Sequence, residues 1–123
     1  MPDERPVAII DDDPSALAAM VSLVNALGYR ALGFGGGDAF LRDMRRAPAS
    51  CVITDIRMPG ISGIDLFTRL AAQPGAVSVI LVTAFPDEAS RRALLRAGAA
   101  GYLAKPVRPQ ELLACLQCAI RED

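Results

Sequence analysis

The chain has 123 residues, a net charge of −1 and 52% hydrophobic residues, which fits one domain with a single core and excludes a disordered chain. No apolar run approaches the roughly 20 residues of a membrane span, and the start MPDERP lacks the apolar stretch of a secretory signal, so we expect a cytoplasmic protein without membrane contact. Balanced charge argues against direct nucleic-acid binding, and the absence of histidine excludes His-based metal sites, Ser-His-Asp catalysis and a phosphohistidine on this chain.

Apolar segments of strand length alternate with segments of helical period along the whole chain. The first half predicts a strand at 7–10, a helix from Pro14 to Gly28, a strand at 30–34 and a helix over 35–47. The second half predicts strands at 51–54, 77–83 and 101–104 and helices at 63–72, 87–98 and 109–120. Five such strand–helix units predict an α/β fold, a parallel sheet with helices on both faces.

The three cysteines, Cys51, Cys115 and Cys118, are an odd number. The last two form a C-x-x-C spacing in the middle of a helical pattern, whereas redox motifs of this spacing open a helix beside a strand. We therefore expect inert, half-buried thiols.

Polar residues follow four of the five predicted strands at the points where these strands end. They are Asp11, Asp12 and Asp13 after the first strand, Asp55 after the third, Thr83 after the fourth and Lys105 after the fifth. The carboxyl ends of parallel strands meet at one edge, where ligands bind in open α/β sheets. Clustered carboxylates repel one another unless a cation offsets them, and an all-oxygen set favours Mg²⁺. A carboxylate there can also act as a nucleophile and form an aspartyl-phosphate.

Each of these residues also has a purely structural interpretation. Asp13, just before Pro14, is the best candidate to cap the first helix, and Asp55 could be a turn residue before Pro59-Gly60. Thr83 could be a strand end and Lys105 a solvated lysine. Any one of these residues could lie at a strand end by chance. It is much less credible that chance placed all of them there.

The segments VAIIDDD, TDIRMPGISGIDL, ILVTA and GYLAKP resemble the receiver domain of bacterial response regulators. The resemblance covers essentially the whole chain and is strongest to FixJ-type receivers, whose phosphorylated loop tends to read D-x-R-M-P-x-x-S-G. It implies a flavodoxin-like (CheY-like) doubly wound sheet with strand order 2-1-3-4-5. It also implies a single receiver domain at 1–123, either independent or cut from a longer response regulator.

The resemblance assigns Asp55 as the phosphoacceptor, which takes a phosphoryl group from the phosphohistidine of a sensor histidine kinase. It implies that Mg²⁺ (or Mn²⁺) is bound by Asp12, Asp55 and the backbone carbonyl of Arg57, with Asp11 acting through water. Thr83 matches the switch hydroxyl, Lys105 the lysine that pairs with the phosphoryl group, and Tyr102 the switch aromatic. The Lys105-Pro106 bond is expected to be cis.

Two positions that vary in the family, here Arg57 and Phe85, could set the lifetime of the phosphorylated state. Both are bulky, and Phe85 cannot orient an attacking water by hydrogen bonding. We therefore expect slow self-dephosphorylation, over minutes or longer. In this interpretation the chain is a signalling phosphoacceptor that catalyses only its own phosphorylation and dephosphorylation.

Receivers of this family commonly signal through the face built from the fourth helix, the fifth strand and the fifth helix. On the fourth helix, Arg91 and Leu95 are expected to point outward. The inward side would consist of Ala89, Ala93, Leu94 and Ala97. Phosphorylation would then promote a homodimer through this face, and DNA would be reached only through an output domain that the sequence lacks.

Three rival functions differ in the residues that they require. A degenerate receiver would act as a protein-binding module that is never phosphorylated, but every site position is intact here. A haloacid-dehalogenase-type phosphatase needs a second carboxylate two residues after its nucleophile, where this chain has Arg57. A flavodoxin-like flavin carrier needs a hydroxyl- and glycine-rich loop after the first strand, where this chain has Asp11, Asp12 and Asp13.

Overall fold

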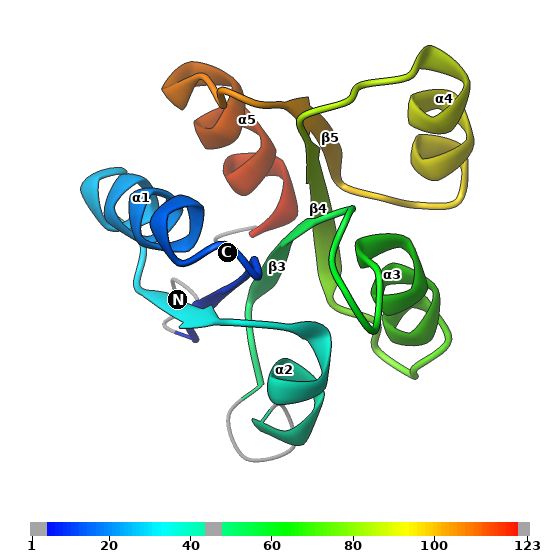
Figure 1. Cartoon of the computed structure of the whole chain (residues 1–123), viewed down its shortest axis with the longest axis horizontal. Helices are drawn as coiled ribbons and strands as arrows, with labels where there is room; N and C mark the ends of the chain where they lie inside the picture. Colours follow the sequence, from blue (N-terminus) through cyan, green and yellow to red (C-terminus); the bar gives the residue numbers. More distant parts are fainter. Residues whose placement is uncertain (1–4, 44–47, 121–123) are drawn as a thin grey trace.

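Five parallel strands form a central sheet, and five helices cover its two faces (Figure 1). The structure is a computed structural model that describes residues 5–43 and 48–120. The strands are β1 (Val7–Ile10), β2 (Ala31–Phe34), β3 (Cys51–Asp55), β4 (Ser78–Thr83) and β5 (Gly101–Ala104). The helices are α1 (Pro14–Ala26), α2 (Gly37–Asp43), α3 (Gly63–Ala71), α4 (Glu88–Arg96) and α5 (Pro109–Ala119).

The strands lie in the order β2-β1-β3-β4-β5 and all pair in parallel, which confirms the predicted CheY-like topology. Ile10 is paired with Thr54 in the register of β1 and β3, and Thr83 with Ala104 in that of β4 and β5. The next residue of each strand therefore emerges at the same edge of the sheet. This register brings together polar residues that are far apart in the sequence.

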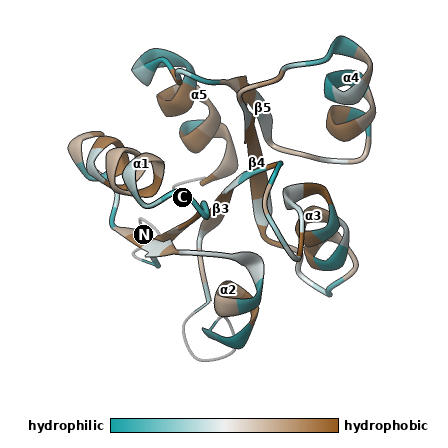
Figure 2. Cartoon of the chain, in the orientation of Figure 1, coloured by the Kyte–Doolittle hydropathy of each residue, from teal (hydrophilic) through white to brown (hydrophobic). Residues whose placement is uncertain are grey.

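The core has two halves, one on each face of the sheet. The α1–α5 core consists of buried strand residues together with Val24, Leu112, Leu116 and Ile120, whereas the α2–α4 core joins the strands to Phe40, Leu66, Phe67, Leu70 and Leu94. Along β1, Val7 and Ile9 face the first core and Ala8 and Ile10 the second, because successive side chains of a strand point to opposite faces. A strand covered on both sides carries apolar residues throughout, as the brown strands of Figure 2 show.

Short polar side chains cap three of the helices that follow the carboxyl edge, α1, α3 and α4. Asp13 accepts a hydrogen bond from Ser15 N–H (3.1 Å), which confirms its predicted capping role. Ser62 caps α3 and Asp87 caps α4 in the same manner. Such a cap stabilises a helix by about 1 kcal/mol.

The predicted orientation of α4 was right for Leu94, which is buried, and for Arg91, which is exposed, but wrong for Leu95 and for the three alanines. Leu95, expected to face outward, is partly buried against the α2–α4 core beside the buried Leu94, whereas Ala89, Ala93 and Ala97 are exposed. Burial of a leucine side chain releases more free energy than burial of an alanine methyl, so α4 turns its two leucines toward the sheet. Arg91 does point outward, and its guanidinium pairs with Glu88 (3.1 Å) on the solvent side.

Other predictions needed smaller corrections. The second helix begins at Gly37 rather than Gly35, and its expected residues 44–47 lie outside the described part of the chain. Only Cys115 is half-buried, because Cys51 is buried and Cys118 is exposed. Among residues 5–43 and 48–120 no helix has the length and apolarity needed to cross a bilayer.

Gly63 provides a test of how the sheet edge is built. A Cβ atom at this position would lie 2.1 Å from the carbonyl oxygen of Asp55, whereas one at Gly35 would meet no atom within 4 Å. Because the obstacle is backbone, we expect Gly63→Ala to lower the free energy of unfolding by at least about 3 kcal/mol and Gly35→Ala by less than about 0.5 kcal/mol. Urea denaturation measures both, and equal stability of the two variants would contradict this packing.

Candidate functional site

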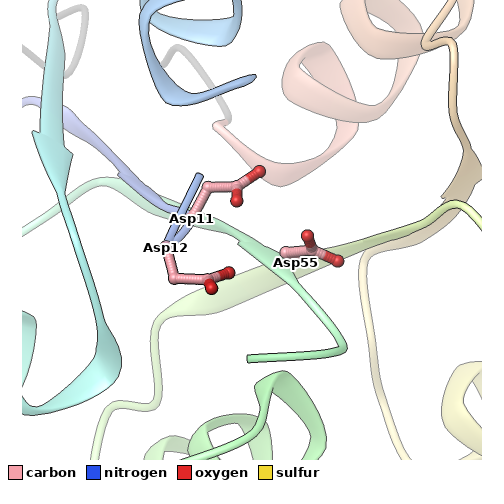
Figure 3. Close-up of side chains that lie close together, drawn as sticks. All are labelled: Asp11, Asp12 and Asp55. Carbon is pink, nitrogen blue, oxygen red and sulfur yellow. The ribbon is translucent and has the colours of Figure 1, made fainter. Parts of the chain in front are cut away.

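Three carboxylates gather where β1 and β3 end. Asp11 and Asp12 follow β1, Asp55 is the last residue of β3, and one oxygen from each lies within 4.8 Å of the others. Figure 3 shows the side chains of Asp11 and Asp12 extending toward the end of β3 that carries Asp55. Asp11 is buried and Asp12 is exposed, so the group reaches from the sheet edge to solvent.

Lys105 supplies the only positive charge that contacts this cluster in the described residues. Its Nζ donates to Asp55 Oδ2 at 2.9 Å and to Asp11 Oδ2 at 3.1 Å. Partial burial lowers the pKa of Lys105, but the hydrogen bonds that its ammonium donates to Asp55 and Asp11, together with the charges of these two residues, outweigh this effect and leave its pKa raised. The ammonium therefore remains charged at neutral pH, and this single cation faces the three carboxyl groups of the cluster.

Backbone hydrogen bonds hold the side chains in this arrangement. The N–H of Lys105 donates to the carbonyl oxygen of Thr83 (2.8 Å), and the N–H of Asp13 donates to Asp11 Oδ1 (3.0 Å). The Lys105-Pro106 peptide bond is cis, as expected. Gly63 is a residue that the sequence analysis missed, although its N–H donates to Ile56 O (2.9 Å) and its lack of a side chain lets α3 approach Asp55.

Thr83 lies buried at the end of β4, with 2% of its surface exposed. Its Oγ1 accepts a hydrogen bond from Phe85 N–H (3.0 Å). The hydroxyl acts here as an acceptor, so its own proton remains available for donation elsewhere. The segment between β4 and α4 is thereby tied to the same strand end that faces Lys105.

Tyr102 lies on β5, partly buried against the α2–α4 core. Its hydroxyl oxygen accepts a hydrogen bond from the N–H of Asp87 (3.0 Å), the residue that caps α4. This bond connects the fifth strand to the start of the fourth helix. The sequence pattern singled out Tyr102 but gave no signal for Asp87 as its partner, because the two are fifteen positions apart.

Arg57 and Phe85 meet from two different loops, the one after β3 and the one after β4. The Arg57 guanidinium carbon lies 4.4 Å from the centroid of the Phe85 ring, which is within the range of a cation–π contact. Both side chains are exposed, Phe85 by 63%. The pair joins the loop after β3 to the loop after β4 on the solvent side.

The carboxylate cluster fits a hard divalent cation. Mg²⁺ prefers oxygen ligands at about 2.1 Å in octahedral geometry, which places two oxygens of one ion about 3–4 Å apart. The oxygens of Asp11, Asp12 and Asp55 lie within 4.8 Å of one another, so small side-chain movements or an intervening water satisfy this geometry. The unbalanced negative charge adds an electrostatic reason for a cation to bind.

Comparison with known proteins agrees with the fold. The family model of the response regulator receiver domain matches residues 7–117. The response regulator protein TmoT of Ectopseudomonas mendocina is 33% identical over 118 residues, which cover 96% of this chain and 54% of TmoT. The transcriptional regulatory protein FixJ of Bradyrhizobium diazoefficiens is 30% identical over 116 residues, which cover 94% of this chain and 57% of FixJ.

The chain thus spans about half the length of these curated relatives. Among solved structures, a response regulator receiver domain protein from Clostridium thermocellum superposes with a TM-score of 0.84 at 28% identity, covering 94% of each chain. The extent of the family match and the similarity to FixJ confirm the resemblance seen in the sequence. The chain belongs to the family of response regulator receiver domains, the signalling modules of two-component systems.

Proposed function

We propose that this receiver domain accepts a phosphoryl group onto Asp55 from the phosphohistidine of a sensor histidine kinase. The observation that carries the proposal is the convergence of three carboxylates and Lys105 on the carboxyl end of β3. In the transfer, an oxygen of Asp55 bonds to phosphorus while the phosphorus–nitrogen bond of the donor breaks. Because the chain has no histidine, the donor belongs to another protein, and the domain acts in the cytoplasm, where such kinases present their phosphohistidine.

The metal-binding residues are proposed from the same cluster. Asp12, Asp55 and the backbone carbonyl of Arg57 would hold Mg²⁺ (or Mn²⁺), and Asp11 would contact the ion through water. The division between direct and indirect ligands is supported by Asp11, which is buried and already accepts hydrogen bonds from Asp13 N–H and Lys105, whereas Asp12 is exposed. The bound ion would supply positive charge that stabilises the oxygens of the phosphoryl group during transfer.

Lys105 and Thr83 are proposed to bind the phosphoryl group after transfer. The ammonium of Lys105 lies 2.9 Å from Asp55 Oδ2, so a small displacement brings it onto a phosphoryl oxygen. The Thr83 hydroxyl would break its bond from Phe85 N–H and donate its proton to another oxygen. Lys105 would exchange its contact with Asp55, and Thr83 its contact with Phe85 N–H, for phosphoryl oxygens, which carry more negative charge.

The switch follows from the connection between this hydroxyl and α4. Movement of Thr83 would release the N–H of Phe85. Phe85 lies two residues before Asp87, whose N–H donates to the Tyr102 hydroxyl oxygen. We infer that Tyr102 turns inward as this loop shifts, and that the α4-β5-α5 face changes with it. Arg91 lies on this face, and Leu95, now partly buried, would become available only if α4 moved. This face would then support a homodimer or contact an output domain that binds DNA.

The first prediction concerns the phosphoacceptor. Incubation with Mg²⁺ and acetyl phosphate should add one phosphoryl group to the parent protein and none to Asp55→Asn, as measured by intact-mass spectrometry. Asp38→Asn, which removes an exposed carboxylate in the first turn of α2, should be phosphorylated as the parent is. Asp12→Asn should react at least about tenfold more slowly because it lacks a metal ligand.

A parent protein that gains no phosphoryl group from acetyl phosphate or from a phosphorylated kinase domain would refute the proposal. It would also favour the degenerate receiver. Titration with Mg²⁺ then provides an independent check, because the proposed chemistry requires metal binding at Asp12 and Asp55.

The second prediction concerns the lifetime of the phosphorylated state. We expect self-dephosphorylation over minutes or longer, because the contact between Arg57 and Phe85 hinders the approach of water to Asp55. Phe85→Ala should shorten the half-life about three- to tenfold, about 1 kcal/mol of barrier, whereas Phe85→Leu keeps a bulky apolar side chain that cannot orient water and should shorten it less. A half-life of seconds in the parent, or an unchanged half-life in Phe85→Ala, would contradict this role.

The third prediction concerns assembly. Beryllofluoride with Mg²⁺ imitates the phosphoryl group on an aspartate, so it should shift the parent protein from monomer toward dimer in a sizing experiment. Asp55→Asn should remain monomeric under the same conditions. Arg91→Glu should weaken the dimer if the α4-β5-α5 face forms it, and a dimer of unchanged affinity would assign the interface to another surface.

A further inference from the structure

One buried polar side chain of the sheet has no role in the site described so far. Thr54 and Thr83 are the two polar residues that are buried within strands in the described part of the chain. Thr54 is completely buried and lies on the face of β3 that carries Val52, toward the α2–α4 core. Its neighbour in the register of β4 is the apolar Leu81. A hydroxyl in such surroundings costs free energy unless a hydrogen bond compensates for it.

The partner of this hydroxyl is the backbone of Asp55. Thr54 Oγ1 donates to the carbonyl oxygen of Asp55 at 3.0 Å. The pairing of β1 with β3 ends at Ile10 and Thr54, so this carbonyl lies beyond the end of that ladder. The side chain of Thr54 therefore supplies a donor to the peptide group that joins Asp55 to the following loop.

Two further contacts hold the same part of the backbone. The N–H of Ile56 donates to Val82 O at 3.0 Å, and the N–H of Gly63 donates to Ile56 O at 2.9 Å. A side chain at Gly63 would collide with the carbonyl oxygen of Asp55, so the start of α3 covers this oxygen closely. The peptide group between Asp55 and Ile56 is thus held by the Thr54 hydroxyl, by β4 and by α3.

The next carbonyl group along the chain is that of Arg57. Within residues 5–43 and 48–120, no hydrogen bond is donated to its oxygen, which leaves this oxygen available to a cation. Each residue contributes two soft dihedral angles to the backbone. Because the peptide groups before Arg57 are held, the positions that its carbonyl oxygen can reach are restricted.

We propose that Thr54 is a positioning residue of the metal site. Its buried hydroxyl holds the Asp55 carbonyl group and thereby fixes the directions in which the Asp55 carboxylate and the Arg57 carbonyl present their oxygens to a divalent cation. Thr54 acts through the backbone and touches neither the ion nor the phosphoryl group. Groups that orient metal ligands in this way contribute to metal affinity although they do not bind the metal. The inference rests on the proposed function of this site.

Substitutions at Thr54 separate this role from that of a strand residue that only fills space. Thr54→Val keeps the branched shape and removes the hydroxyl, whereas Thr54→Ser keeps the hydroxyl and removes the methyl group. Thr54→Ala removes both. A role in packing alone would make the serine variant resemble the alanine variant and the valine variant resemble the parent. A role of the hydroxyl predicts the opposite grouping.

The test is a titration of the isotope-labelled protein with Mg²⁺, followed by amide NMR in the absence of any phosphoryl donor. We expect Thr54→Val and Thr54→Ala to bind Mg²⁺ about tenfold more weakly than the parent. Thr54→Ser should bind it as the parent does. Val79→Ala is the matched control, because it removes methyl groups from the same core at the other end of β4. It should lower stability to urea and leave the affinity for Mg²⁺ unchanged.

A second measurement needs no metal. The N–H of Ile56 belongs to the same peptide group as the Asp55 carbonyl, so loss of the Thr54 hydrogen bond should loosen its bond to Val82 O. In EDTA, we expect this amide to exchange its hydrogen about tenfold faster in Thr54→Val than in the parent. Thr54→Ser should exchange more slowly than Thr54→Ala.

The outcomes distinguish this inference from the proposed function. If the parent binds Mg²⁺ and Asp12→Asn weakens that binding, equal affinity in the parent, Thr54→Val and Thr54→Ala would overturn the role of Thr54 alone. Equally weak binding by Thr54→Ser and Thr54→Ala would overturn it as well. A parent protein that binds no Mg²⁺ would overturn both the inference and the proposed function. If the valine variant does not fold, the comparison of the serine and alanine variants still decides.

Discussion

The bridge from Lys105 to Asp11 and Asp55 is the interaction on which the site depends. Two carboxylates at the ends of neighbouring strands repel each other, and both side chains are largely withdrawn from solvent. The ammonium between them offsets this repulsion, whereas its loss would leave buried charge without a partner, which costs several kcal/mol. Because one ammonium faces the three carboxylates of Asp11, Asp12 and Asp55, the neutralisation is incomplete, and the site retains the electrostatic demand that a divalent cation satisfies.

This bridge exists only because the sheet is in register. Asp11 and Asp55 leave β1 and β3 one position after Ile10 and Thr54, which are paired, and Lys105 follows Ala104, the partner of Thr83. A slip of one residue would turn each of these side chains to the other face. The apolar residues of β1, β3 and β4, buried on both faces, prevent such a slip, so the two cores position the charged groups as much as the loops do.

The same edge contains a continuous set of contacts from the acidic cluster to α4. Thr83 binds Phe85, the ring of Phe85 lies against Arg57, and the N–H of Asp87 binds Tyr102. Each contact is a single hydrogen bond or cation–π interaction near the surface, worth about 1 kcal/mol. Contacts of this size are exchanged at little cost, as a switch requires, while the sheet below them stays fixed.

Local patterns were sufficient to predict the strands, their alternation with helices, the cap at Asp13 and the polar residues that follow four of the five strands, because hydrophobic period and position within an element are local properties. The family pattern supplied the strand order and the cis bond before Pro106. Which side of α4 is buried could be seen only in the folded chain, since alanine and leucine stripes both repeat at helical spacing and the sheet selects the larger side chains. It also decided the partners of Tyr102 and Phe85, the need for glycine beside Asp55 and the unequal burial of the cysteines, because these depend on contacts between elements far apart in the chain.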